Sequence, residues 1–401
     1  MLFLGVKMMT SVKNKITLAG LICALSIQPS GPQAISTLPI VSASRSGYVG
    51  DEACRDCHFQ KLESYSQTAH KLTSGLPTKD SVLGSFAVGK NILKTSNPAL
   101  YFRMESRPAG FFQTSVTTLS SVPSMQSEKM DIVIGSGRTG QTYLFWKDDR
   151  LFELPVSYWS GLRGWVSSPG YGDDIADFDR PVTPRCLECH TDFAGTIPGP
   201  DPPNHYYPPS LIMGISCERC HGPGRKHLDA TKVTTSDARI INPVKLPRDR
   251  QIELCAQCHD SSRRPVAAAF SYLPGERLDN FLQPTPSLTS STAEVHGNQV
   301  GLLMRSRCFR FSATMSCSTC HDVHQIQREA ANFSGHCLTC HRADNCGEFR
   351  KLGAKISKDC IDCHMPVQPS SKIISLSNGK ELEAKVRTHW IKIYPEKQPT
   401  E

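Results

Sequence analysis

Apolar and aromatic residues between residues 76 and 180 gather in short segments that are separated by turn residues. Two pairs of such segments stand out: Ala99–Met104 with Phe111–Val116, and Tyr143–Trp146 with Leu151–Leu154. The first pair is separated by Arg107–Gly110 and the second by the charged run Lys147–Arg150. Short aromatic and β-branched segments bounded by turns are typical of strands. Residues 76–180 therefore predict a small β-sheet region.

A single apolar run, Ile16–Ile27, lies near the start of the chain and follows Lys7, Lys13 and Lys15 without any acidic residue. This run is shorter than a membrane-spanning helix, which needs about 20 residues. A basic segment followed by a short apolar run is typical of a secretory signal. We expect residues 1–34 to be a signal peptide and the mature protein to be periplasmic or otherwise exported. Cys23 would leave with the signal, and lipid attachment there is the less favoured alternative.

The remaining chain divides into four parts on the pattern of helix, turn and cysteine residues. Residues 45–75 form a first module, in which Asp51 and Glu52 lie near a helix start and Lys61–Lys71 predicts helix. Residues 181–266 and 267–390 form the next two parts, and Gly-Pro-rich stretches such as Pro198–Pro203 and His221–Gly224 in the first of them predict short helices joined by tight loops. Residues 391–401 form a tail.

The chain has 17 cysteines, and fourteen of them fall into one repeated pattern, Cys-x-x-Cys-His. One copy lies in residues 45–75, none in 76–180, and three in each of the next two parts. In order, the seven motifs are Cys54/Cys57/His58, Cys186/Cys189/His190, Cys217/Cys220/His221, Cys255/Cys258/His259, Cys317/Cys320/His321, Cys337/Cys340/His341 and Cys360/Cys363/His364.

This motif is the attachment site of c-type haem. The two thiols form thioether bonds to the haem, and the adjacent His binds the iron. Disulfides and zinc sites also use cysteine pairs, but neither explains an adjacent His in all seven copies. The sequence thus predicts seven covalently attached haem c groups. Residues 181–389 offer about 35 residues per haem, too few for an ordinary core around each, so the haems are expected to form the core there.

The chain has 14 histidines, so seven remain outside the motifs, one for each predicted haem. Two His ligands on every iron would give six-coordinate centres suited to electron transfer. A surplus His can also be an ordinary surface residue. The candidate distal ligands are His70, His227, His296, His324 and His389, followed by His205 in a Pro-rich loop and His336 directly before Cys337. Methionine is the alternative ligand, with Met104, Met213, Met304 and Met315 available.

His324 lies only three residues after the motif residue His321. Residues at this spacing occupy the same side of a helical turn. Because the two axial ligands of one iron stand on opposite faces of the porphyrin, His324 is expected to bind a neighbouring haem. The same argument applies to His227, six residues after His221.

The formal net charge of +8 does not indicate nucleic-acid binding. Without residues 1–34 the charge is +5, and fourteen haem propionates would bring it to about −9. Basic side chains are therefore expected to pair with propionates. The sequence leaves open whether Cys308 and Cys346 form a disulfide.

The chain resembles the multihaem cytochrome family that includes the tetrahaem cytochrome c-554 electron carriers, over most of residues 48–390. The resemblance is carried by Tyr48–Cys54 with Ser66–His70, by Cys217–His227, by Val295–Gln299, by Cys317–His324, by Cys360–Pro366 and by Thr388–Trp390. It implies distal roles for His70, His227, His296, His324 and His389. The implied fold is that of a multihaem cytochrome c: short helices and loops packed around haems, here with seven motifs and an inserted β-sheet region (α+β).

Two functions follow as hypotheses. The first is an exported carrier that transfers electrons through closely packed, mainly bis-His haems between redox partner proteins, with a quinol-oxidising membrane component as a possible donor. The second is an oxidoreductase of small nitrogen or sulfur compounds, which needs one five-coordinate haem. No Cys-x-x-Cys-Lys motif, the variant that some multihaem nitrite reductases use, is present. The sequence therefore favours the carrier and names no catalytic residue.

Overall fold

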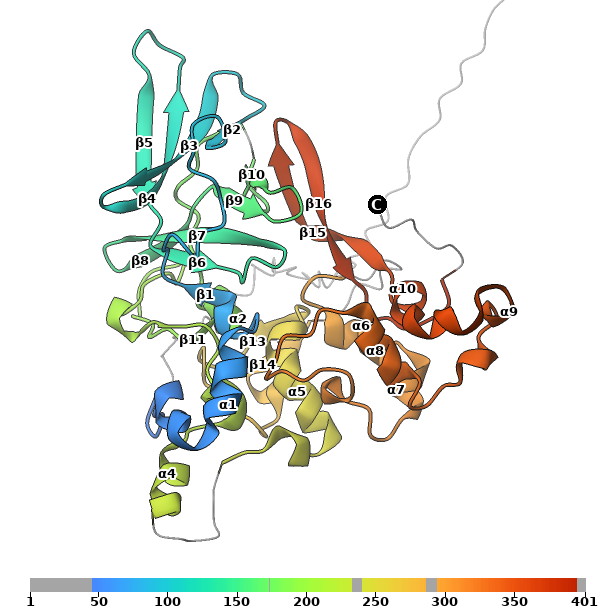
Figure 1. Ribbon diagram of the computed structural model, residues 1–401. Helices are drawn as coiled ribbons and strands as arrows, with labels where there is room; N and C mark the ends of the chain where they lie inside the picture. Colours follow the sequence, from blue (N-terminus) through green and yellow to red (C-terminus); the bar gives the residue numbers. More distant parts are fainter. Residues whose placement is uncertain (1–44, 173, 233–239, 286–293, 395–401) are drawn as a thin grey trace, which may run out of the picture. The chain divides into compact units, whose positions relative to one another are not determined.

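The computed structural model describes residues 45–172, 174–232, 240–285 and 294–394 (Figure 1). The predicted signal peptide, Cys23 and the tail from residue 395 onward lie outside these ranges. All described residues belong to one compact unit. Within them, no helix is both long enough and apolar enough to cross a membrane.

Residues 74–167 form two antiparallel sheets, as the sequence predicted for this part of the chain. One sheet has the strand order β2-β3-β4-β5, and the other has the order β1-β6-β7-β9-β10 with β8 paired to β7. The strands are β1 Ser74–Gly75, β2 Ile92–Lys94, β3 Leu100–Arg107, β4 Gly110–Thr117, β5 Ser124–Lys129, β6 Ile132–Ile134, β7 Gly140–Lys147, β8 Arg150–Glu153, β9 Val156–Trp159 and β10 Gly164–Ser167. The two predicted strand pairs are β3–β4 and β7–β8, each closed by a two-residue turn.

These sheets, which we call the insert, have a hydrophobic core of their own. Phe102 and Met104 on β3 pack with Tyr143 on β7, Leu154 and Trp165, and all five side chains are buried. Gln113 also lies inside this core and is fully buried. Its side-chain amide donates to the backbone oxygen of Val156 and accepts from the backbone nitrogen of Val156 (2.6 and 2.9 Å). A buried polar group is tolerated when its hydrogen bonds are made.

The helices are short and lie mainly outside the insert. They are α1 Arg55–Ser66, α2 Pro184–His190, α3 Glu218–His221, α4 Arg225–Lys232, α5 Arg248–His259, α6 Gln299–Met304, α7 Arg307–Phe311, α8 Ala330–Cys337, α9 Phe349–Leu352 and α10 Cys360–His364. The predicted helix Lys61–Lys71 is wrong at its end, because α1 stops at Ser66. The hydroxyl of Thr68 donates to the backbone oxygen of Tyr65 (2.7 Å), and this local bond competes with continuation of the helix.

A long hairpin near the C-terminus was not predicted from the sequence. Its strands are β15 Val367–Ser377 and β16 Lys380–Arg387, and smaller two-stranded pairs are formed by β11 Thr191–Phe193 with β12 Ile212–Met213 and by β13 Arg263–Pro265 with β14 Leu282–Pro284. The hairpin turns at Asn378-Gly379, where both residues have positive φ angles of 50° and 72°. Positive φ at both central residues is the geometry of a type I′ turn, for which Asn-Gly is a preferred sequence. The hairpin could therefore have been predicted from these two residues. The amide of Leu376 donates to the hydroxyl of Ser167 on β10 (2.7 Å), which ties the hairpin to the insert.

The expectation that haems alone form the core of residues 181–389 is wrong for its middle part. Leu254 on α5 packs with Tyr272, Leu278, Val300 and Phe309 in a buried apolar cluster. The polypeptide between the motifs therefore supplies some hydrophobic core. In residues 317–364, by contrast, the only buried residues are Ser334, Ile356 and Ile361.

Candidate haem-binding site

A cavity of about 3820 Å³ runs among the cysteine motifs. Ordinary small-molecule pockets have volumes of roughly 300–1,000 Å³, so this cavity has room for several large ligands. All fourteen motif cysteines and thirteen of the fourteen histidines line it; His205 is the exception. Residues that are dispersed over more than 300 positions of the sequence thus line one continuous cavity.

Each motif adopts a local turn that presents its thiols and its imidazole together. The backbone amide of the motif His bonds to the carbonyl of the first Cys, as between His221 and Cys217 (3.0 Å), and His341 and Cys337 (2.9 Å). This is one turn of helix, which brings residues three and four apart to the same face. The short x-x spacer is therefore what allows two thioether bonds and one iron ligand to be directed at a single haem.

Four motif histidines are also held through their Nδ1 atoms. His221 Nδ1 donates to the backbone oxygen of Ile241 (2.8 Å), and His364 Nδ1 donates to that of Lys392 (2.9 Å). His259 Nδ1 bonds to the side-chain oxygen of Gln299 (3.2 Å), and His190 Nδ1 lies 3.2 Å from the hydroxyl of Thr73. An occupied Nδ1 leaves Nε2 as the metal-binding nitrogen and fixes the plane of the ring.

The structure places a non-motif histidine next to a motif histidine in five cases. Four pairs have ring centroids 6.0–6.5 Å apart: His58 with His227 (6.5 Å), His259 with His70 (6.0 Å), His221 with His324 (6.1 Å) and His321 with His389 (6.2 Å). The fifth pair, His190 with His296, is close enough to interact electrostatically. In every pair the two residues come from different motifs or from distant parts of the chain.

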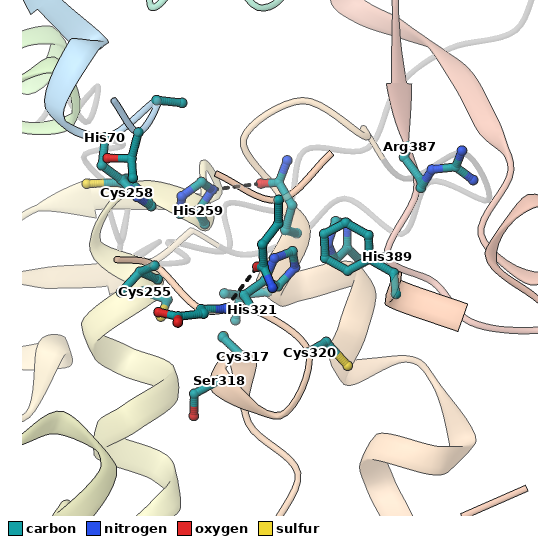
Figure 2. Close-up of a pocket in the computed structure, with 18 of the residues that line it drawn as sticks. His70, Cys255, Cys258, His259, Cys317, Ser318, Cys320, His321, Arg387 and His389 are labelled. Atoms are coloured by element: carbon teal, nitrogen blue, oxygen red, sulfur yellow. Dashed lines mark hydrogen bonds between the residues drawn. The ribbon is translucent and has the colours of Figure 1, made fainter. Parts of the chain in front are cut away.

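This spacing fits an iron between the two rings. Metal–nitrogen bonds to His are about 2 Å long, so two imidazoles on opposite sides of one metal hold their ring centroids about 6 Å apart. Figure 2 shows two of these pairs, with His70 beside His259 and His321 beside His389. The Nδ1 atoms of His227 and His389 are buried without a hydrogen-bond partner, as expected of rings that face a group other than protein. The residues present therefore fit bound haem.

Burial keeps the paired histidines in the form that binds metal. Removal from solvent lowers the pKa values of His70, His190 and His389 to about 4, and in each case a neighbouring His adds to the effect. Neutral imidazole is the ligand form of histidine. These side chains are therefore ready to coordinate at neutral pH.

Two acidic residues, whose role at the site the sequence analysis did not predict, connect the first module to the third motif. Glu218, inside that motif, is 1% exposed and accepts hydrogen bonds from the amides of Val49, Gly50 and Gly224 (2.7–3.0 Å). Asp51 accepts from the amide of Cys217 (2.8 Å) and pairs with Lys71 (2.6 Å). Charged groups are buried only when paired or hydrogen-bonded, so these carboxylates fix the position of the first module. The feature of the sequence that could have indicated this role is the position of Glu218 inside a haem motif.

His389 is positioned by a different device. It follows strand β16, and the buried hydroxyl of Ser306 donates to its backbone oxygen (3.2 Å) and accepts from the amide of Ile391 (2.7 Å). The unpredicted hairpin therefore has a role in the site, because it carries the chain back to His321.

The remaining candidate ligands are placed differently. His205 lies outside the cavity, and its Nδ1 is 3.0 Å from a carboxylate oxygen of Asp149. His336 lines the cavity and interacts electrostatically with His321. Of the four candidate methionines, only Met315 lines the cavity. Cys308 and Cys346 are both free thiols that line it.

The attachment cysteines of different motifs are neighbours. Interactions between their thiols link the first motif to the third, the third to the fourth, the fourth to the fifth, the fifth to the sixth and the sixth to the seventh, while the second lies beside the fourth. The thiols of Cys54 and Cys217, of Cys255 and Cys317, and of Cys189 and Cys258 are close enough for a hydrogen bond. The other links, which are electrostatic, are Cys220 with Cys255, Cys320 with Cys337, and Cys337 with Cys360. The seven sites therefore form a continuous series with one branch.

Known proteins show similar features. Residues 173–222 match the sequence profile of a family described as cytochrome c554 and c-prime. A cytochrome c-552 from Maridesulfovibrio salexigens is 21% identical over 254 residues, which cover 52% of this chain and half of that relative. The crystal structure of the outer cell wall cytochrome OcwA matches 86% of this chain and 80% of its own, with a TM-score of 0.53 and 17% identity, and so has the same fold. With the repeated motifs, these likenesses identify the chain as a multihaem c-type cytochrome with covalently bound haem c.

Proposed function

We propose that this protein carries seven haems and transfers electrons through them outside the cytoplasm, with at least five of the irons bound by two histidines. When bound, haem iron supplies reversible one-electron transfer. The protein would contribute the axial ligands, the order of the sites and the walls of the cavity.

The observation that carries this proposal is the set of five histidine pairs. Each pair joins the proximal His of one motif to a His that belongs to another segment, so every proposed iron crosslinks two parts of the chain. His227 follows the third motif but faces His58 of the first. His324 follows the fifth motif but faces His221 of the third. This arrangement supports the proposal that a His close to its own motif serves a neighbouring haem.

The order of the attachment sites supports transfer over the whole array. Thiols of successive motifs lie near one another, which supports an arrangement in which the attached haems lie side by side. The first and seventh motifs stand at the two ends of the series, and the second motif forms a branch at the fourth. We propose that redox partner proteins donate and accept electrons at these ends and that a quinol-oxidising membrane component is one donor.

Export rests on the sequence alone. The basic N-terminus and the apolar run Ile16–Ile27 favour a cleaved signal peptide. Mass spectrometry of the purified protein tests both points, since we expect a chain lacking residues near 1–34 with seven added haems. Five or fewer additions would contradict the proposed count.

The His324→Ala variant tests the ligand assignment. Its expected result is conversion of one haem in seven from low spin to high spin, with the haem count unchanged, because His221 keeps its iron and no thioether bond is touched. Electron paramagnetic resonance and the visible spectrum report the change. The matched control is His205→Ala, which should leave both spectra as they are. A spectrum unchanged by His324→Ala would contradict the assignment.

A further inference from the structure

The segment that follows strand β16 lies against the seventh motif. Its first anchor is the guanidinium group of Arg387, the last residue of β16. One nitrogen of this group donates to the backbone oxygens of Ile361 and Met365 (both 2.9 Å), and another donates to a carboxylate oxygen of Asp362 (2.7 Å). These partners lie within the motif or directly after it, and a charge-assisted pair is the strongest kind of hydrogen bond in proteins. A single side chain thus holds the end of the strand against the seventh motif.

A second anchor lies further along the chain, at Lys392. Nδ1 of His364, the histidine of the seventh motif, donates to the backbone oxygen of Lys392 (2.9 Å), and the amide of Lys392 donates to the backbone oxygen of His364 (3.3 Å). Between the two anchors, the amide of the buried Thr388 donates to the backbone oxygen of Pro366 (3.1 Å). We call residues 387–392 the tether. Both of its ends are fixed by the seventh motif.

The tether carries the ligand candidate of a different haem. His389 lies in its middle, and its ring is stacked on that of His321 in the fifth motif, with the centroids 6.2 Å apart and the planes at 25°. Figure 2 shows His389 beside His321, with the guanidinium group of Arg387 directed away from this pair. Because the hydrogen bonds of that group are made to the seventh motif, Arg387 acts on the fifth site through the backbone of the tether.

The fifth and seventh sites are not neighbours in the order of the attachment thiols. The sixth motif stands between them, since Cys337 interacts electrostatically with Cys320 on one side and with Cys360 on the other. The tether joins the two outer sites directly. It supplies the proposed distal ligand of the fifth iron and the hydrogen-bond acceptor of the proximal ligand of the seventh. A bond to the second ring nitrogen of a ligating His orients the ring and tunes the metal, so the tether acts at both sites.

We propose that Arg387 is a positioning residue that couples the fifth and seventh haems: it locks the tether onto the seventh motif and thereby holds both His389 and the carbonyl group of Lys392 in place. The inference rests on the proposed bis-His ligation of the fifth iron. It implies that a change within the seventh motif alters the ligand field of the fifth haem, although both ligands of that haem are kept. The pair between Arg387 and Asp362 transmits this effect.

Electron paramagnetic resonance of the oxidised, full-length holoprotein tests the proposal. His389→Ala identifies the fifth haem by the low-spin signal that it abolishes. Arg387→Gln should shift that same signal and one further signal, which we assign to the seventh haem, with the haem count unchanged. Asp362→Ala should shift the same two signals by less, because two of the three bonds of Arg387 remain. Lys380→Gln is the matched control: it removes a positive charge from the same strand at an exposed position that does not line the cavity, and it should shift neither signal.

The outcomes separate this inference from the proposed function. If His389→Ala abolishes no low-spin signal, the proposed ligation of the fifth iron is wrong and the coupling falls with it. If His389→Ala abolishes one signal and Arg387→Gln leaves that signal in place, the ligation stands and the coupling is overturned. A shift in Arg387→Gln without any shift in Asp362→Ala would also overturn it, because Arg387 would then act directly at the fifth haem. If Arg387→Gln does not accumulate, Asp362→Ala decides, since it must shift the signal of the fifth haem from a position in the seventh motif.

Discussion

The insert and the segment 317–364 are built in opposite ways. In the insert, strands bury apolar side chains such as Phe102, Tyr143 and Leu154 against one another, and the polypeptide supplies its own core. In residues 317–364, which hold three haem motifs, only Ser334, Ile356 and Ile361 are buried. Most other side chains of that segment that are not at the surface line the cavity.

The difference shows two ways to meet the entropy cost of ordering a chain. Burial of apolar area offsets that cost in the insert at about 25 cal/mol per Å². A segment with few buried residues needs covalent and metal bonds instead, as small domains need disulfides or metals. We therefore expect perturbation of haem attachment and perturbation of side-chain packing to affect different regions.

The largest effect is expected from loss of a haem attachment. Cys220→Ser should abolish or weaken attachment of the third haem and remove the site that joins the first and fourth motifs. Residues 181–389 should then become sensitive to protease, while the insert stays protected. Mass spectrometry of the intact protein and of its proteolytic fragments measures both effects.

The control for this variant is Cys308→Ser, which changes a cavity-lining thiol outside the motifs and should keep all haems. Normal proteolytic resistance in Cys220→Ser would show that the haem has no structural role, and the contrast between the two regions would then be wrong.

An intermediate effect is expected from truncation of the insert core. Leu154 is fully buried, and Leu154→Ala should destabilise the insert by about 2–5 kcal/mol through lost packing and the cavity left behind. Faster hydrogen exchange of the insert amides measures the loss, and the haem spectra should not change. Leu119→Ala, at a side chain that is 80% exposed, should be within about 0.5 kcal/mol of the parent protein. A change in haem spin state in Leu154→Ala would show that the insert core and the haem array are coupled.

The smallest effect concerns the pH dependence of the insert. Burial raises the pKa of Glu153, partly opposed by Arg180, which lies 3.3 Å away. The folded state thus holds this proton more tightly than the unfolded state, whose pKa is near 4.5. The stabilising contribution is full below that value and is lost as the pH rises through the folded pKa.

Glu153→Gln should therefore flatten the decline of insert stability above pH 4.5, as measured by thermal unfolding over a pH series. Asp80→Asn, at an exposed carboxylate of the same region, serves as the control and should leave the slope unchanged. An equal change in both variants would mean that net charge, and not burial of Glu153, sets the slope.

Much of the site was predictable because covalent chemistry fixes it locally. Two thioether bonds and one iron ligand require Cys-x-x-Cys-His within one helical turn, so each motif is visible without a fold. The strand pairs of the insert were predictable for a similar reason, since side-chain alternation and two-residue turns are local. The hairpin β15–β16 was not predicted, although its turn sequence Asn378-Gly379 is an equally local indication of a hairpin.

The sequence by itself determined the class of protein, the number and position of the attachment motifs, and the pool of histidines from which distal ligands are drawn. Only the tertiary structure decided how that pool is used: that His324 faces His221, that His389 is returned to His321 by a hairpin, and that His205 pairs with Asp149 instead. The physical reason is that proximal ligands are set by adjacency in the chain. Distal ligands depend on which distant segments pack together. Buried groups such as Glu218 hold those segments together through hydrogen bonds, and their partners cannot be read from their position in the sequence.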